Sequence, residues 1–416
     1  MRSEEVLALG ELAQDAVSGV TDQARGMHTA IAQNVFRAIG PAAAPVKVIH
    51  DRIAAGAYGA AQEGLEELVH AGSRVLSARR RHDAPSIERS AAGRALVGAL
   101  NGAFGDTLAR RASPLAVPLT IRRRQCDVPS SREGLAQAFP DATPRLAVFV
   151  HGLGETDDTW RLGASTRVPY GAALQAQLGY TPLYIRYNSG RHVSENGREL
   201  ARQLDLVSAN WPVELQEIAL FGHSMGGLVC RSACHYAVEG GSEWTARVRH
   251  VFTLGAPHGG APLEQAVNVA SAALNLIGPT RALAQGLNAR SAGIKDLRFG
   301  YLLDDDWLDQ DPDAFLLNTG NEIPFLAGAN HYFVCATLSR EPATPIGRIV
   351  GDMLVLRSSA WAHGRGAERM RFPVEHYHHV GAANHFDLLN HPAIYEQLRS
   401  WLGAPAALAA GGAQRP

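Results

Sequence analysis

The stretch "IALFGHSMGGLVCRSA", from Ile218 to Ala233, decides how this sequence is interpreted. A run of aliphatic residues ends at Gly222, Ser224 follows two positions later, and two glycines then lead into a second apolar run. A buried strand that turns sharply into a helix has this pattern, and a serine in such a turn is strained, with its hydroxyl above the sheet edge. The stretch therefore predicts a strand–turn–helix unit that presents Ser224 as a nucleophile. The alternative is a glycine-rich turn in which this serine only caps the helix.

Composition places the chain among globular proteins and excludes a dominant charge field. It has 416 residues, 46% hydrophobic and 19% charged, with 39 Lys and Arg against 40 Asp and Glu. Such a balance favours no nucleic-acid partner. The basic runs "ARRRH" and "TIRRRQ" are interpreted as solvated faces or junctions rather than binding patches.

Cysteine usage indicates neither a disulfide framework nor a metal site. Cys126, Cys230, Cys234 and Cys335 form no CxxC, and no His/Cys cluster has zinc spacing, so we expect no metal and no cofactor. Cys230 and Cys234 are one helical turn apart and should be core thiols. The N-terminus lacks an apolar core of signal-peptide length, and no run of about eighteen apolar residues appears, so we expect no transmembrane span and a cytoplasmic location.

Residues 1–112 form a predicted N-terminal helical region. "GLEELVHAGSRVL" and "GRALVGALNGAFGDTLARR" carry apolar residues at helical spacing, and in the second segment the stripe comprises Leu96, Leu100, Phe104 and Leu108. Two interpretations stay open. The helices pack as a cap on the main domain, or they lie on a membrane or a partner, which would make the protein peripheral to a membrane.

Residues 116–403 alternate short β-rich runs with helical ones. The β-rich runs are nearly continuous in aliphatics, which is typical of strands buried on both faces, so we predict an α/β fold with a mostly parallel sheet and helices on both faces. An insertion over 261–330 interrupts this alternation, and the tail 404–416 is expected to be disordered. The runs that predict strands are "RLAVFV", "TPLYIRY", "EIALFG", "VRHVFTLG", "HYFVCATL" and "EHYHHV".

A serine nucleophile needs donors for the oxyanion, a base and an acid that orients the base. The donors are predicted from "AVFVHGLGETDDTW", in which a buried strand ends in an HG-x-G turn. The backbone N–H groups of Leu153 and of Met225, the residue after the serine, are the expected oxyanion-hole donors. His151 is expected to organise this loop rather than to transfer protons.

The base is predicted from "HHVGAANHFDLLNHPAIYEQLRSWL". His385 follows a short strand and a Gly/Ala/Asn loop and precedes the closing helix, whereas His378 and His379 lie in the strand and His391 begins the helix. His385 is therefore the predicted base, and Asp387 should bond locally.

The acid should fall between the serine and the histidine in the chain. Asp352 lies between Gly351 and an apolar run, past a strand end, and is the predicted acid; a simple turn aspartate is the alternative. A cluster of four further aspartates competes, but it precedes that strand and is expected to form a solvated or gating loop. Its members are Asp304, Asp305, Asp306 and Asp309.

With these residues placed, residues 116–403 resemble the α/β-hydrolase superfamily, and within it a bacterial esterase/lipase group similar to the hydrolase domain of GPI inositol-deacylases. The resemblance is carried by "VFVHGLGET", "LFGHSMGGLVCRSA", "TLGAPHGGAPLE", "VGDMLVLRSSA" and "NHFDLLNHPAIYEQLRSWL". It implies the nucleophile at Ser224, the acid at Asp352 and the base at His385. His258 in "GAPHGG" matches a family loop and should be structural. The family often has Gly after the acid, where this chain has Met353.

The expected function is a serine hydrolase that cleaves carboxylic esters of acyl or lipid substrates through an acyl-enzyme on Ser224. The insertion over 261–330 would form a lid or simply pack as a cap. The same machinery could serve a thioesterase or an acyltransferase. The alternative from another class is a lipid-surface or partner-binding protein that acts through residues 1–112. A GPI substrate is not inherited, because the N-terminal region lies outside the resemblance.

Overall fold

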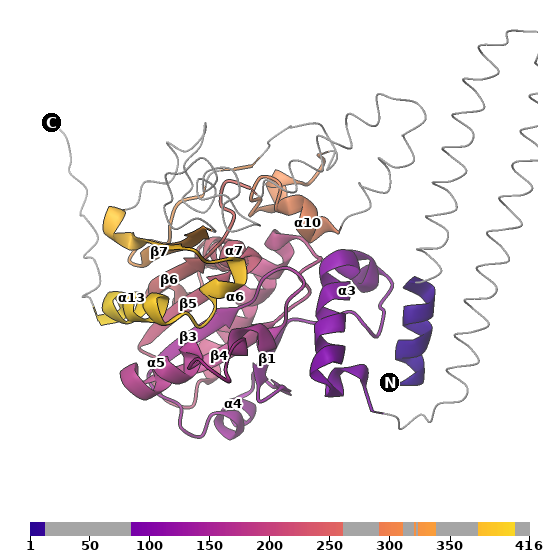
Figure 1. The fold of residues 1–416 in the computed structure, drawn as a ribbon, viewed down its shortest axis with the longest axis horizontal. Coiled ribbons are helices and arrows are strands. Elements are labelled where there is room, and N and C mark those ends of the chain that lie inside the picture. The colour runs from indigo at the N-terminus through magenta and orange to yellow at the C-terminus, as the bar shows by residue number, and fades with distance from the viewer. Residues whose placement is uncertain (13–84, 261–290, 311–319, 322, 338–372, 404–416) are drawn as a thin grey trace, which may run out of the picture.

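The computed structural model describes residues 1–12, 85–260, 291–310, 320–321, 323–337 and 373–403 (Figure 1). Predictions for residues 13–84 of the N-terminal region, for residues 261–290, 311–319 and 322 of the insertion, and for the tail 404–416 lie outside these ranges.

Within the described residues the fold is built on one eight-stranded sheet. Its order is β2-β1-β4-β3-β5-β6-β7-β8; neighbours from β4 to β8 run parallel, and β1 pairs antiparallel with both β2 and β4. The strands are β1 Thr120–Arg123, β2 Cys126–Val128, β3 Arg145–Val150, β4 Tyr180–Arg186, β5 Glu217–His223, β6 Val248–Leu254, β7 Asn330–Thr337 and β8 Tyr377–Gly381.

Helices cover both faces of this sheet, as the continuous aliphatic runs predict. In β3, Leu146, Val148 and Val150 pack with α6 and α7 on one face, whereas Ala147 and Phe149 pack with α5 and α13 on the other. Strands buried on both faces need apolar residues at every position, which explains the absence of alternation. The α-helices labelled in Figure 1 are α3 Ala91–Arg110, α4 Arg132–Ala138, α5 Tyr170–Leu178, α6 Val193–Asn210, α7 Met225–Glu239, α10 Ala292–Asp296 and α13 Pro392–Gly403. The 3₁₀ turns are η2 Ile87–Arg89, η3 Asp157–Arg161, η4 Glu243–Arg247, η6 Asp304–Asp306, η7 Val374–His376 and η8 His385–Leu388.

The interpretation of "TIRRRQ" as a solvated face or junction is wrong for its first half. These residues form strand β1 and a tight hairpin turn, in which Arg124 and Gln125 have φ of 47° and 68°. Positive φ at both central residues is the backbone that a two-residue hairpin requires. Ile121 is buried because it packs in the core with Val128 and Leu135, and Arg122 is buried between the carboxylates of Asp127 and Asp157.

Helix α3 buries only part of its predicted apolar stripe. Leu108 is buried, whereas Leu96 and Phe104 are 45% and 42% exposed, so the cap interpretation does not account for the whole stripe. The buried side carries Val97 and Leu108 together with small and polar residues. A helix over residues 3–12 packs on α3 through Ala8, and the pair stands beside the β1 end of the sheet (Figure 1).

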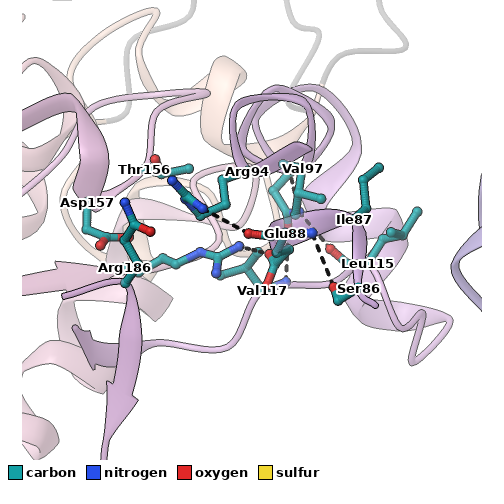
Figure 2. Close-up of polar contacts among 12 residues, drawn as sticks. Ser86, Ile87, Glu88, Arg94, Val97, Leu115, Val117, Thr156, Asp157 and Arg186 are labelled. Atoms are coloured by element: carbon teal, nitrogen blue, oxygen red, sulfur yellow. Dashed lines mark hydrogen bonds and ion pairs between the residues drawn. The ribbon is translucent and has the colours of Figure 1, made fainter. Parts of the chain in front are cut away.

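Ion pairs fasten this helical region to the sheet. Figure 2 shows Arg186 of β4 reaching the carboxylate of Glu88 in η2, and Arg94 of α3 donating to the carbonyl of Glu88. Arg94 Nε also lies 2.5 Å from the Asp158 carboxylate. These arginines line a polar cavity of about 640 Å³, and each buried arginine of its wall is paired with a carboxylate.

The described part of the insertion is tied down over the sheet edge. Ser291 Oγ donates to the Gly102 carbonyl of α3 at 2.6 Å, and the Asp296 carboxylate accepts from the Val193 N–H at 2.8 Å. Asp306 is 1% exposed and accepts hydrogen bonds from four N–H groups of neighbouring residues. The prediction was a solvated or gating loop, and solvation is wrong for Asp306, whose buried carboxylate organises the loop.

Candidate active site

Ser224 lies where strand β5 passes into helix α7, as the sequence predicts for its strand–turn–helix unit. Its φ and ψ are 52° and −125°, a strained backbone for a residue with a side chain. The turn is held because the Ser224 N–H donates to the Leu254 carbonyl at 2.8 Å and its carbonyl accepts from the Gly227 N–H at 3.0 Å. The structure thus keeps a partly exposed serine in strain at the N-terminus of a fifteen-residue helix, where the helix dipole favours negative charge.

Close backbone approach explains the small residues around this serine. A β-carbon on Gly226 would collide with the carbonyl oxygens of Val150 and His151 at the end of β3. A β-carbon on Gly152 would lie 2.9 Å from the β-carbon of Ser224. The loop after β3 therefore lies directly against the serine, and only glycine fits at both contacts.

His151 holds this loop from inside the protein. The ring is fully buried, its Nδ1 lies 2.9 Å from the Gly152 carbonyl, and its Nε2 lies 3.3 Å from the Tyr187 N–H. Because Nε2 faces a donor, Nδ1 must carry the proton, and burial lowers the pKa of His151 to about 4. His151 is therefore a neutral donor to the loop, which agrees with the organising role predicted for it.

The Gly152–Leu153 peptide is oriented by these bonds. The Gly152 carbonyl accepts from His151 Nδ1 and from the Glu155 N–H at 3.3 Å. In a planar trans peptide the next N–H points away from the carbonyl, so the Leu153 N–H is directed away from both donors. Within the described residues it donates to no protein acceptor. Met225 is the first residue of α7, so its N–H has no partner inside the helix.

A buried acid–histidine pair, which the sequence analysis did not identify, lies beside the serine. The Glu155 carboxylate accepts from the Gly152 N–H at 2.8 Å and lies 2.9 Å from His223 Nδ1. Burial raises the pKa of Glu155, but the neighbouring His223 and the Gly152 N–H outweigh it and hold that pKa below its ordinary value. The sequence signal that could have predicted this pair is an acid directly after the HG-x-G turn together with a histidine directly before the serine.

His385 reaches the same edge of the sheet from the other end of the chain. It begins η8, is 2% exposed, and its carbonyl lies 3.3 Å from His223 Nε2. The two imidazole rings are 4.8 Å apart. A β-carbon on Gly255, which follows the residue bonded to the Ser224 N–H, would lie 2.9 Å from His385 Cε1. The structure therefore brings His385 and Ser224 into one neighbourhood.

Of the remaining residues singled out in the sequence, one lies outside the described residues and the others lie within them. Asp352 lies outside the described residues. Asp387 bonds locally, because its carboxylate accepts from the Asn384 N–H at 3.0 Å in a capping box. His258 is buried beside Thr253 and Arg231, which agrees with the structural role expected for it. Cys230 and Cys234 are free and buried, as predicted.

Comparison with known proteins agrees with this geometry. Residues 142–276, which contain the loop after β3 and the Ser224 turn, match the family described as PGAP1-like alpha/beta domain. In this part the chain is similar to α/β hydrolases of the esterase/lipase group. Its sheet, its helices on both faces and its strand–serine–helix turn are those of the predicted fold.

Two curated relatives of this chain are named S-formylglutathione hydrolase. The rat protein is 33% identical over 113 residues, which cover 26% of this chain and 34% of that protein. The mouse protein is 33% identical over 104 residues, which cover 24% and 31%. The chain thus spans about a third of the length of the curated relatives it matches.

Several solved structures resemble this chain at low identity. The mature lipase BlEst2 of Bacillus licheniformis is 19% identical with a TM-score of 0.39, covering 62% of this chain and 91% of that one. An esterase of the archaeon Pyrobaculum calidifontis is 14% identical with a TM-score of 0.36, covering 77% and 91%. The phospholipase PlaB of Legionella pneumophila is 16% identical with a TM-score of 0.31, covering 53% and 46%.

Among the residues that the structure describes, no helix combines the length and the apolar character needed to cross a membrane.

Proposed function

We propose that the chain is a serine hydrolase that cleaves carboxylic esters through an acyl-enzyme on Ser224. The observation that carries the proposal is the serine itself, held at a φ of 52° between a buried strand and a helix N-terminus. Strain at a polar residue persists only where the surrounding structure enforces it, and such positions cluster at active sites. The neighbourhood of Gly152 and of the buried His385 supports the same conclusion.

The reaction uses the remaining residues in stated roles. Ser224 Oγ forms a bond to the ester carbonyl carbon while His385 takes its proton, and the N–H groups of Leu153 and Met225 stabilise the oxyanion. Collapse breaks the bond to the alkoxide, which leaves as the alcohol with the proton from His385. Water then attacks the acyl-enzyme while His385 takes one of its protons; the bond from the acyl carbon to Ser224 Oγ breaks, His385 returns that proton to Ser224, and the carboxylic acid leaves. Asp352 orients the imidazole.

The test is a serine substitution with a matched serine control. Ser224→Ala should lower kcat/KM for p-nitrophenyl butyrate by about 10³-fold or more, since the nucleophile is lost. Ser208→Ala, which alters a half-buried hydroxyl on α6, should retain wild-type turnover. A fluorophosphonate probe should label Ser224, located by mass spectrometry of the labelled peptide. Wild-type turnover by the Ser224→Ala protein would refute the role.

A thioester is the second candidate substrate class. The relatives in rat and mouse are named for S-formylglutathione, which is a thioester, and the same acyl-enzyme chemistry would release a thiol instead of an alcohol. Comparing kcat/KM for matched p-nitrophenyl and S-acyl esters of one chain length decides between the classes. Addition of alcohol acceptors with product analysis tests the acyltransferase alternative.

Contact with a lipid surface or a partner through the N-terminal region is a separate proposal. The specific observation in its favour is that Leu96 and Phe104 of α3 are exposed at 45% and 42%. Flotation with phosphatidylcholine vesicles, compared between wild type and Leu96→Ser/Phe104→Ser, tests it. Equal recovery of both proteins in the vesicle fraction would exclude a role for this face.

A further inference from the structure

Helix α3 carries glycines on the side that faces the candidate active site. Gly98, Gly102 and Gly105 are spaced by four and three residues, so they share one face, and all three are buried. Glycine is among the least favourable residues in a helix interior. Three glycines on one buried face therefore indicate that the helix backbone must approach something closely.

What the helix approaches is the loop that follows the proposed oxyanion donor. A β-carbon on Gly102 would lie 2.7 Å from the Cα and 2.8 Å from the backbone nitrogen of Gly154. On Gly98 it would lie 2.8 Å from the methyl of Thr156 and 2.9 Å from the carbonyl oxygen of Glu155. Two of the loop's backbone segments thus press directly on the backbone of α3.

The contact is fixed by hydrogen bonds from both flanks. The Gly154 N–H donates to Ser189 Oγ at 2.9 Å, and Asn188 Nδ2 donates to the Gly105 carbonyl at 2.8 Å. Ser291 Oγ donates to the Gly102 carbonyl at 2.6 Å. Helix α3 is therefore bound to the same β4–α6 connection that holds the loop, and it cannot shift without moving both.

On its other side the loop meets the serine. Gly152 lies against Ser224, and Glu155 joins the Gly152 N–H to His223. The loop is thus enclosed between the turn that carries Ser224 and the glycine face of α3.

We infer that helix α3 is a positioning element of the active site: through Gly98 and Gly102 it sets the distance of the Leu153 N–H from the oxyanion formed at Ser224. This inference rests on the proposed function of Ser224. An oxyanion donor acts within about 2.7–3.1 Å of the oxygen, and loss of one donor costs about 10²–10³-fold in kcat. A helix outside the recognised hydrolase motifs therefore controls the reaction without touching the substrate.

The test adds one methyl to the glycine face. Gly102→Ala should lower kcat for p-nitrophenyl butyrate by about 10- to 100-fold, with KM within about threefold of wild type, because an oxyanion donor acts in the transition state. Ala92→Ser and Ala95→Ser, which add one atom at exposed positions of the same helix, are the controls and should keep wild-type kcat. All variants are assayed below their melting temperatures, measured by circular dichroism.

A second variant keeps the test decisive if Gly102→Ala does not fold. Gly98→Ala should also lower kcat, and Gly98→Ala/Thr156→Ser, which removes the methyl nearest to the new β-carbon, should recover part of it. Folded glycine variants with wild-type kcat would overturn the inference. So would exposed-face controls that lose as much kcat as the glycine variants do. If Ser224→Ala retains activity, the proposed function fails instead, so the two failures are distinguishable.

Discussion

Replacing Glu155 by glutamine should lower both the stability of the protein and the turnover proposed for Ser224. The carboxylate is 9% exposed and holds two donors, the Gly152 N–H at 2.8 Å and His223 Nδ1 at 2.9 Å. Glutamine keeps the shape and one acceptor oxygen, but it is neutral and its NH₂ group must face one of the two donors. His223 then retains a buried ring beside the His385 carbonyl without its charged partner.

The magnitude follows from the bonds that are lost. A hydrogen bond to a charged group contributes about 1.5–3 kcal/mol, and a donor left unsatisfied in the interior costs about 1–3 kcal/mol. We expect Glu155→Gln to lower the free energy of unfolding by about 2–4 kcal/mol. Because Glu155 also fixes the loop that ends in Leu153, we expect kcat to fall by about 10- to 100-fold, short of the loss of a whole oxyanion donor.

The pH dependence gives an independent check. The pKa of Glu155 lies below its ordinary value of 4.5 in the folded protein. A carboxyl with a lowered folded-state pKa contributes stability that is fully present above its unfolded pKa and is lost as the pH falls through its folded pKa. The difference in Tm between wild type and Glu155→Gln should therefore be constant from pH 7 to about pH 5 and should narrow on further acidification.

The assays are differential scanning calorimetry across pH 7 to 3.5 and steady-state hydrolysis of p-nitrophenyl butyrate. Glu199→Gln, on the solvent side of α6 where it pairs with Arg202, is the matched control and should leave Tm and kcat within error of wild type. A Glu155→Gln protein with unchanged Tm and kcat, or a Tm difference independent of pH, would refute the reasoning.

Three further outcomes follow from the same contacts. Glu88→Gln should lower the free energy of unfolding by about 1–2 kcal/mol, because Arg186 loses its charged partner and Glu88 is itself partly solvated; chemical denaturation measures it. Asp306→Asn should lower the free energy of unfolding by about 2–4 kcal/mol, because the single amide oxygen cannot accept all four hydrogen bonds that the carboxylate accepts. An unchanged denaturation midpoint would contradict this. His151→Ala should lower kcat by about 10-fold or more without moving the acid limb of the pH–rate profile, because the pKa of His151 is about 4 and the ring is neutral where the enzyme is assayed.

Local sequence pattern was sufficient for the parallel part of the sheet and for the serine turn. A strand buried on both faces needs a continuous aliphatic run, and a strand–serine–helix turn needs glycine where backbones meet, so both leave a signature within about ten residues. His385 could be predicted as a residue that arrives at the same sheet edge, because η8 precedes a well-marked closing helix. Asp352 and the lid motion remain predictions.

The sequence failed where the partner of a residue is distant in the chain. The apolar stripe of α3 did not identify the face that packs on the loop after β3, because that face packs through glycines and hydrophobic periodicity does not detect close backbone contact. Arg122 was expected in solvent and is buried, because carboxylates from its own hairpin and from the β3–α5 connection surround it.

What the sequence by itself determined is the fold class and the strand–turn–helix unit that carries Ser224, since both depend on neighbouring residues within one strand and one helix. Only the tertiary structure decided that Glu155 pairs with His223 beside the serine, and that helix α3 packs against the loop after β3. The physical reason is that burial, charge pairing and backbone contact depend on which segments meet in space, and those segments lie about 50 to 70 residues apart in this chain.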